Sequence, residues 1–313
     1  MVTEYARERL LQAAGFLPRH LKMAIGGLPE ALQGEIEEIR LRAGRPMTVV
    51  VPDREIPTGS IVTGDDLELT IEITSQASAY AVLNQVKNGF VTIRGGHRLG
   101  ICGTGVMKNG ELYNLRQVSS LALRVARELP GAAVPLLPGL QEKGALKSTL
   151  ILSPPGRGKT TLLRDLIRCI SDGQGVQASR VGVADERGEL AAMFGGLPQM
   201  KIGARTDVVD SCPKAAAMLM LLRGMNPQVL AVDEITAPED VEAMEIAAGC
   251  GVVLLATAHA GSLEDLCHRP LYRRLMEENI FHRIVLIELS EGQRRYQISK
   301  WGEDPCTVGS ARP

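Results

Sequence analysis

A glycine-rich turn at residues 153–160, Ser-Pro-Pro-Gly-Arg-Gly-Lys-Thr, constrains the fold of this chain more than any other part of its sequence. Residues 149–152 precede it as an apolar, strand-like run, and residues 160–170 follow it as a helical run. A strand, a glycine-rich turn and a helix in this order form a phosphate-binding loop, or P-loop. Ser153 stands where the strict pattern has glycine, at a strand end that tolerates a small side chain. The segment therefore predicts an α/β domain of the P-loop type rather than a chance glycine turn.

The residues of this turn suit a ligand with a chain of phosphates. Gly156 and Gly158 let the backbone direct its N–H groups inward, and together with a helix N-terminus these donors form an anion site. Lys159 would reach the β- and γ-phosphates, and the Thr160 hydroxyl would bind Mg²⁺. We therefore predict ATP and Mg²⁺ as ligands. The loop residues expected to contact the nucleotide are Ser153, Pro154, Pro155, Gly156, Arg157, Gly158, Lys159, Thr160 and Thr161.

Two acidic residues end the apolar run at residues 228–234. Strand tips at the carboxyl edge of a parallel sheet face the ligand crevice. Asp233 is predicted to hold the Mg²⁺ shell through water, and Glu234 to polarise the attacking water. Phosphoryl transfer depends mainly on positioning and charge neutralisation, so these acids matter more than a covalent nucleophile. The alternative is a solvated acidic loop after a buried strand.

Two further strand-like runs end in polar residues. Asp185 and Glu186 follow residues 180–184, and either could orient water or metal, or belong to a surface cluster. Thr257 and His259 end a run that starts at Val252, where they could sense the γ-phosphate or serve as structural residues. The chain has no Asn-Lys-x-Asp segment, which disfavours guanine-specific chemistry.

The order of strand-like and helical runs changes along the 313 residues of the sequence. The first part mixes a strand-turn-strand at residues 35–51 with a helix at residues 74–87 and short strand-like runs around glycines at 90–94, 99–102 and 104–107. From residue 149 on, strand-like and helical runs alternate, which is typical of a RecA-like P-loop domain with a largely parallel sheet flanked by helices. Prolines and glycines in residues 130–144 indicate a connection between the two parts. The predicted divisions are a small mixed α/β N-terminal domain at 1–135, the P-loop ATPase domain at 136–302 and a loose tail at 303–313.

Local signals mark two helix starts and a hairpin in the second domain. Thr236 and Ser262 are each followed by an acid three residues later, the pattern of a helix N-cap. Residues 284–289 and 295–299 are strand-like runs separated by a turn, which predicts a hairpin near the end of the chain.

The composition excludes several functional classes. Lys and Arg number 35 against 36 Asp and Glu, and aromatic residues make up only 3%, so binding to nucleic acid is not expected. The six cysteines and five histidines do not group with metal-ligand spacing, so no metal cluster is expected. The apolar runs fall well short of the ~20 residues of a membrane span. A cytoplasmic protein with reduced thiols is the expectation.

The motifs occur together in a way that resembles the secretion-type (type II/IV) ATPases, and within them a sporulation branch. The resemblance covers nearly the whole chain. The combination of SPPGxGKTTLLRD, ADERGE and LLRGMNPQVL is specific for the sporulation branch. The segments that carry the resemblance are residues 38–46, 95–100, 123–124, 184–186, 222–234 and 254–260.

The resemblance implies a homo-oligomeric ring, a hexamer, with ATP between neighbouring subunits. Arg98 and Arg124, with Arg94 behind them, would complete the site from an adjacent subunit's N-terminal domain, as arginine fingers do. The chain departs from the family at one point, because secretion ATPases usually have Gly-Glu where this chain has Asp-Glu. The acid of the family's Asp box often serves as the base, so Glu186 competes with Glu234 for this role.

For the sporulation branch, the resemblance implies a motor in the mother-cell cytoplasm. It would drive assembly of, or transport through, a channel between mother cell and forespore, and it would lie at the membrane through membrane-protein partners. These implications rest on resemblance alone. Two alternatives stay open: a P-loop ATPase associated with single-stranded nucleic acid, and a nucleotide-dependent scaffold with little turnover.

Overall fold

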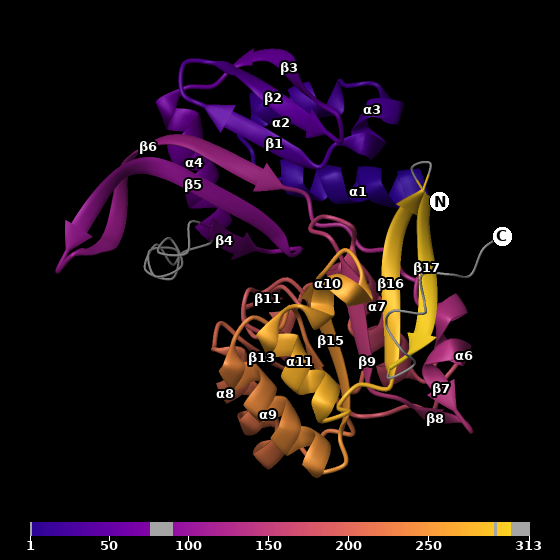
Figure 1. Cartoon of the computed structure of the whole chain (residues 1–313). Helices are drawn as coiled ribbons and strands as arrows, with labels where there is room; N and C mark the ends of the chain where they lie inside the picture. Colours follow the sequence, from indigo (N-terminus) through magenta and orange to yellow (C-terminus); the bar gives the residue numbers. More distant parts are fainter. Residues whose placement is uncertain (1, 76–89, 291–292, 302–313) are drawn as a thin grey trace. The chain divides into compact units, whose positions relative to one another are not determined.

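The computed structural model describes residues 2–75, 90–290 and 293–301, which form two compact units (Figure 1). The first unit consists of residues 1–127 together with 192–199, and the second of 128–191 together with 200–313. The sequence placed the division after residue 135 and did not assign residues 192–199 to the first part. The predicted tail, residues 303–313, lies outside the described residues.

The first unit is built on a six-stranded sheet with the order β3-β2-β1-β6-β5-β4, in which neighbouring strands are antiparallel. The strand-turn-strand predicted at residues 35–51 is confirmed as β1 and β2. Alternate residues of these two strands are buried, and the buried face joins the apolar sides of the helices in one core. The strands are β1 (Glu38–Arg42), β2 (Pro46–Val51), β3 (Arg54–Ile61), β4 (Phe90–Ile93), β5 (His97–Lys108) and β6 (Glu111–Arg124). The helices are α1 (Val2–Ala14), α2 (Arg19–Gly26), α3 (Glu30–Glu35) and α4 (Gly64–Ser75).

One prediction for this unit falls almost wholly outside the described residues, and another differs from the structure. The helix predicted at residues 74–87 lies outside the described residues apart from Thr74 and Ser75, which end α4. The separate short strands expected at 99–102 and 104–107 are one long strand, β5. Its pairing with β6 shifts register around Gly103, and this irregularity explains why the glycines there looked like breaks.

The second unit has a seven-stranded sheet with the order β13-β10-β14-β15-β9-β16-β17. All neighbouring strands are parallel except the last pair, so the predicted largely parallel sheet is confirmed. The hairpin predicted near the end of the chain is β16 and β17. The strands are β9 (Thr149–Ser153), β10 (Val181–Asp185), β13 (Thr206–Asp210), β14 (Val229–Val232), β15 (Val253–His259), β16 (Arg283–Ser290) and β17 (Gln293–Lys300).

Helices cover both faces of this sheet (Figure 1). α8 (Lys214–Gly224), α9 (Pro238–Gly249) and α11 (Pro270–Glu277) share one apolar cluster with alternate residues of the strands. α7 (Lys159–Asp172) packs against β9, β10 and β15, and its buried leucines lie outside that cluster, so it covers the other face. Every residue of β9, β10 and β14 is buried, as expected for strands covered on both sides.

Small elements complete the units. The connection at residues 130–144 contains a short helical stretch, η1 (Val134–Leu136) and α6 (Leu137–Leu140), and α10 (Leu263–Cys267) precedes α11. Two short hairpins were not predicted. They are β7 (Gln141–Glu142) with β8 (Ala145–Leu146), and β11 (Met193–Phe194) with β12 (Leu197–Pro198).

One of the two predicted helix caps is confirmed. The Ser262 side chain accepts a hydrogen bond from the Asp265 N–H, 3.1 Å away, at the start of α10. The prediction for Thr236 is wrong. Pro238 is the first residue of α9, so the cap position falls on Ala237, and the Asp240 carboxylate accepts the N–H groups of Thr236 and Ala237 at 3.0 and 3.1 Å.

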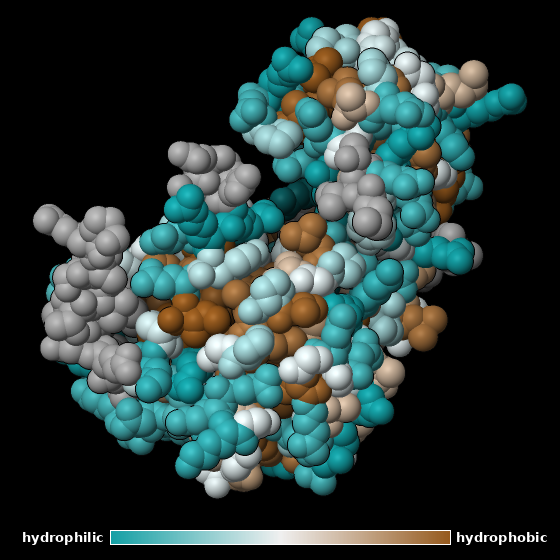
Figure 2. All heavy atoms as spheres, turned by 90° about the vertical axis from the view of Figure 1, so that its right-hand side faces the viewer, coloured by the Kyte–Doolittle hydropathy of each residue, from teal (hydrophilic) through white to brown (hydrophobic). Residues whose placement is uncertain are grey.

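Hydrophilic and apolar residues are interspersed on the face that Figure 2 shows. Exposed large apolar side chains include Met220 on α8, Ile246 on α9 and Leu289 on β16. Among the described residues, no helix combines the length and the apolar character that crossing a bilayer requires.

Candidate active site

The glycine-rich turn joins β9 to α7 in the second unit. β9 ends at Ser153, α7 begins at Lys159, and Gly156 and Gly158 have φ values of +74° and +96°, which favour glycine. Gly158 occupies the N-cap position of α7, and no side chain caps the helix. The N–H groups of the first helical turn therefore face the loop, and this arrangement binds anions.

The Lys159 ammonium group is folded back onto this loop. Its Nζ donates to the carbonyl oxygens of Ser153 and Pro154 at 2.9 and 3.3 Å and lies 2.7 Å from Nδ1 of His259. Burial lowers the pKa of Lys159, while the nearby negative charges of Asp233 and Glu234 act in the opposite direction. A phosphate group would replace these neutral partners with a charged one.

The tip of β14 meets the start of α7 through one hydrogen bond. The Thr160 hydroxyl donates to the Asp233 carboxylate, with 2.8 Å between the oxygens, and Thr257 on β15 donates to the other carboxylate oxygen at 2.7 Å. These residues meet because β9, β15 and β14 are adjacent parallel strands whose carboxyl ends share one edge. Burial raises the pKa of Asp233, and the two hydroxyl groups oppose that shift.

This oxygen pair fits Mg²⁺. A magnesium ion commonly takes one or two protein oxygens and completes its octahedron with water and substrate phosphates. Asp233 is a half-buried carboxylate whose hydrogen-bond partners are neutral hydroxyls, so a cation nearby would stabilise its charge. In the described part of the chain, no three His, Cys, Asp or Glu side chains cluster as metal ligands. A site of one carboxylate and one hydroxyl agrees with that.

Glu234 has a constrained position beside this pair. Its φ is +52°, uncommon for a residue other than glycine. The hydrogen bonds around it hold that backbone conformation, because Thr257 Oγ1 accepts the Glu234 N–H at 2.8 Å and the Thr257 carbonyl accepts the Ile235 N–H at 3.0 Å. Left-handed backbone maintained in this way is frequent at functional sites.

The Glu234 carboxylate has two basic partners. Oε2 lies 3.0 Å from Nη1 of Arg187, and Oε1 lies 3.2 Å from Nε2 of His259. An ammonium group can only donate, so His259 accepts from Lys159 through Nδ1, and we assign the proton of a neutral ring to Nε2, facing Glu234. His259 thus links the loop lysine to the acid at the end of β14.

Asp185 and Glu186 have partners of a different kind. The buried Asp185 carboxylate accepts N–H groups from Glu189, Leu190 and Ala191 at 2.8 to 3.1 Å, so it fixes the loop after β10. Glu186 pairs with Nζ of Lys214 at 2.9 Å. The structure thus links the predicted site residues Lys159, Thr160, Asp233, Glu234 and His259 by contacts among themselves. Asp185 and Glu186, at the end of β10, instead contact the following loop and Lys214.

The three predicted arginines all belong to the first unit. Arg98 on β5 and Arg124 on β6 are directly opposite each other in the sheet register, which puts them on the same face. The Arg98 guanidinium lies 4.2 Å from the centre of the Phe90 ring, and Arg124 Nε lies 3.9 Å from a Glu38 oxygen. Arg94 is exposed and follows β4.

Sequence reasoning missed two site residues. Arg187 follows the two acids of β10 directly, and its place at a strand tip was a usable signal. Lys214 is buried at the start of α8 and also contacts the Thr236 hydroxyl at 3.0 Å and Asp240 at 3.7 Å. No local sequence pattern predicts this role, because the partners Glu186, Thr236 and Asp240 are distant from Lys214 in the sequence.

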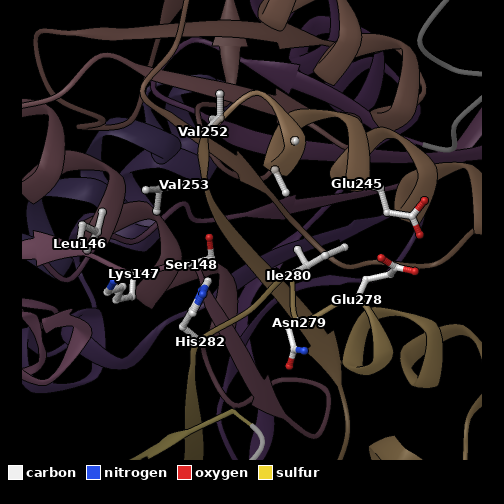
Figure 3. A pocket seen from close by; sticks show the side chains of 13 residues that line it. Leu146, Lys147, Ser148, Glu245, Val252, Val253, Glu278, Asn279, Ile280 and His282 are labelled. Atoms are coloured by element: carbon white, nitrogen blue, oxygen red, sulfur yellow. The ribbon is translucent and has the colours of Figure 1, made fainter.

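A separate hollow lies at the other edge of the same sheet (Figure 3). Residues just before β9, β15 and β16 line it, including Ser148, Val252 and His282, together with Glu245 and Glu278. This is the amino edge of the parallel strands, whereas the P-loop lies at the carboxyl edge. The hollow is therefore not part of the candidate site.

Comparison with known proteins identifies the family. The family described as "Sporulation stage III, protein AA" matches residues 25–298. The chain belongs to this family. It is 40% identical to the Stage III sporulation protein AA of Bacillus subtilis (strain 168) over 282 residues, covering 90% of this chain and 92% of that protein.

Solved structures of secretion ATPases share the fold. The ATPase DotB of Yersinia pseudotuberculosis superposes with a TM-score of 0.62 at 15% identity, covering 94% of this chain and 83% of DotB. The pilus retraction motor PilT, solved with bound ADP, superposes with a TM-score of 0.58 at 18% identity, covering 87% of this chain and 80% of PilT. At these identities the likeness establishes the fold, a P-loop ATPase fold, and not the activity.

Proposed function

We propose that this chain binds ATP with Mg²⁺ at the loop between β9 and α7 and hydrolyses it. The observation that carries the proposal is the 2.8 Å hydrogen bond between Thr160 and Asp233. It holds the hydroxyl after the loop lysine close to the acid at the tip of β14, two strands from β9, so one magnesium ion could bind both. The names of the similar structures, an ATPase and a motor with bound ADP, support the same reading.

Each residue has a role in this reaction. Lys159 exchanges the carbonyls of Ser153 and Pro154 for phosphate oxygens, and the N–H groups around Gly156 and Gly158 bind the same chain. Thr160 and Asp233 hold Mg²⁺, which neutralises phosphate charge when bound. Thr161, one position further along α7, would contact the α-phosphate. Pro155 and Arg157 belong to the same loop.

Glu234 is the better candidate for orienting the attacking water. Its backbone is fixed by Thr257, its carboxylate lies beside His259, and the position follows Asp233 directly. Glu186 is held by Lys214, so it would have to give up an ion pair to act. His259 contacts both Lys159 and Glu234, so a γ-phosphate bound by Lys159 would change the contacts of His259 and, through them, the position of Glu234.

We further propose that the chain works as a homo-oligomeric ring, a hexamer, in which Arg98 and Arg124 of one subunit complete the site of its neighbour. The adjacent placement of the two arginines on β5 and β6 supports a joint role. Two arginines side by side supply the kind of positive charge that a phosphoryl-transfer site completed in trans uses.

In the cell we propose a role in the mother-cell cytoplasm, at the membrane through membrane-protein partners. There the ATPase would drive assembly of, or transport through, a channel to the forespore. The sporulation family name and the secretion-ATPase fold support this role.

ATP turnover by the purified chain tests the proposal. We expect Mg²⁺-dependent release of phosphate, and loss of both ATP binding and turnover in Lys159→Ala. Absence of ATP binding at millimolar concentration in the wild type would overturn it. Binding without turnover would favour the scaffold alternative instead, and ATPase stimulation by single-stranded DNA or RNA would favour the nucleic-acid alternative.

A further inference from the structure

The C-terminal hairpin runs past the phosphate loop. β16 pairs in parallel with β9, and Leu286 is opposite Leu152, the residue before the last of β9. β16 then continues to Ser290, beyond the end of β9, and β17 returns beside it with Arg294 opposite Leu289. The start of β17 therefore lies beyond the end of β9, and Figure 1 shows β16 and β17 side by side as the last strands of the sheet.

Arg294 contacts the loop from this position. Its Nε donates to the Arg157 carbonyl at 3.1 Å. A Cβ atom placed on Gly158 would lie 3.1 Å from Nε, 3.2 Å from Cζ and 3.4 Å from Nη2 of Arg294. The guanidinium group thus lies against the backbone of the glycine that caps α7, and any side chain at residue 158 would displace it.

The guanidinium keeps donors for a ligand. It has five N–H groups, of which one is used on the Arg157 carbonyl. Arg294 is exposed, and among the described residues its contact is with a carbonyl and not with a carboxylate. Arginine binds phosphate bidentately through its planar fork, and the positive end of a helix dipole attracts the same ligand.

We propose that Arg294 contacts the phosphate chain of the bound nucleotide, as a second cation supplied by the same subunit. This inference rests on the proposed function. It assigns a nucleotide-binding role to the C-terminal hairpin, which lies more than a hundred residues from the loop in the sequence. The contact with residues 157 and 158 favours phosphate over base, because the N–H groups of that loop bind phosphates.

Four variants of the full chain test this role. Binding of ADP with Mg²⁺ is measured by calorimetry, and binding of inorganic pyrophosphate by competition with a fluorescent ADP. We expect Arg294→Ala to bind both ligands roughly tenfold more weakly, the usual loss for one charge-assisted hydrogen bond. Arg294→Lys should recover part of the affinity because it keeps the charge. Arg295→Ala is the matched control, since the next residue of a strand points to the opposite face.

Arg294→Gln separates a phosphate contact from simple support of the loop. Glutamine can still donate to a carbonyl but carries no charge, so we expect it to bind as weakly as alanine. Full wild-type affinity in Arg294→Gln or in Arg294→Ala would overturn the inference. Thermal unfolding without ligand checks that all variants are folded. If wild type itself fails to bind ADP, the proposed function fails; if wild type binds and Arg294→Ala binds equally well, only this inference fails.

Discussion

At the scale of single residues, the two acids that compete for the catalytic base have different surroundings. Glu234 lies beside His259 and Arg187, and Glu186 is paired with Lys214. We expect Glu234→Gln to lower kcat by at least about a hundredfold, the contribution typical of a general base, while ATP still binds. Glu186→Gln is the matched control and should change kcat by less than about tenfold, because it removes one partly exposed ion pair. The reverse ranking in a phosphate-release assay would give the base role to Glu186.

His97 in the first unit makes the free energy of unfolding depend on pH. It is fully buried, its Nδ1 accepts the Ala126 N–H at 3.1 Å, and among the described residues its Nε2 has no hydrogen-bond partner. Burial, helped by the positive charge of Arg9, lowers the pKa of His97 to about 3. The folded state therefore disfavours the protonated ring that the unfolded chain accepts near pH 6.5.

The sign of this effect follows from proton linkage. Between pH 6.5 and about 3 the unfolded state binds more protons, so the titration of His97 has no effect on stability above pH 6.5 and destabilises the fold increasingly as the pH falls below it. We expect the free energy of unfolding to fall by roughly one kcal/mol per pH unit below pH 6.5, and His97→Gln to flatten the slope. Urea unfolding at pH 7.5 and 5.5 measures this.

At the scale of elements, Asp185, which is buried, and Asp233, which is half-buried, are carboxylates at neighbouring strand tips with opposite roles. Asp185 accepts three N–H groups of its own loop. We expect Asp185→Asn to lower the stability of the ligand-free protein by about 1–3 kcal/mol, because an amide cannot accept on both sides. Asp233→Asn should leave that stability unchanged or higher, since burial opposes the charge there. It should instead abolish the rise in melting temperature that ATP with Mg²⁺ produces. Equal effects of both variants in calorimetric melting would argue against this division of roles.

The strands, the P-loop and the strand-tip acids could be predicted because each is a local pattern of apolar runs, glycines and charges. Ser262 was predictable as a cap for the same reason. The Thr236 prediction failed because Pro238 set the helix start one residue later. Lys214 and Arg294 could not have been found, since their partners come from loops and strands distant in sequence. Contacts between segments that become neighbours only in the folded sheet are set by packing of the whole unit. They leave no periodic pattern in the sequence.

At the scale of the whole molecule, the proposed ring predicts that association depends on nucleotide. ATP bound between subunits would stabilise the oligomer by mass action. We expect a higher solution mass with ATP and Mg²⁺ than without, measured for Glu234→Gln so that ATP is not consumed. A mass that stays monomeric at concentrations where ATP is fully bound would contradict a nucleotide-linked ring.

Sharing of the site between subunits makes a sharper prediction. Arg98→Ala/Arg124→Ala has an intact loop but lacks the arginines, and Lys159→Ala has the arginines but lacks the loop lysine. We expect each variant to be inactive alone. In a ring with sites between subunits, a 1:1 mixture forms active sites wherever the first variant's loop meets the second variant's arginines, which is roughly a quarter of all positions. The mixture should therefore regain up to that fraction of wild-type turnover after exchange. If the arginines act within their own subunit, no mixture regains activity, because every subunit lacks one half of its site.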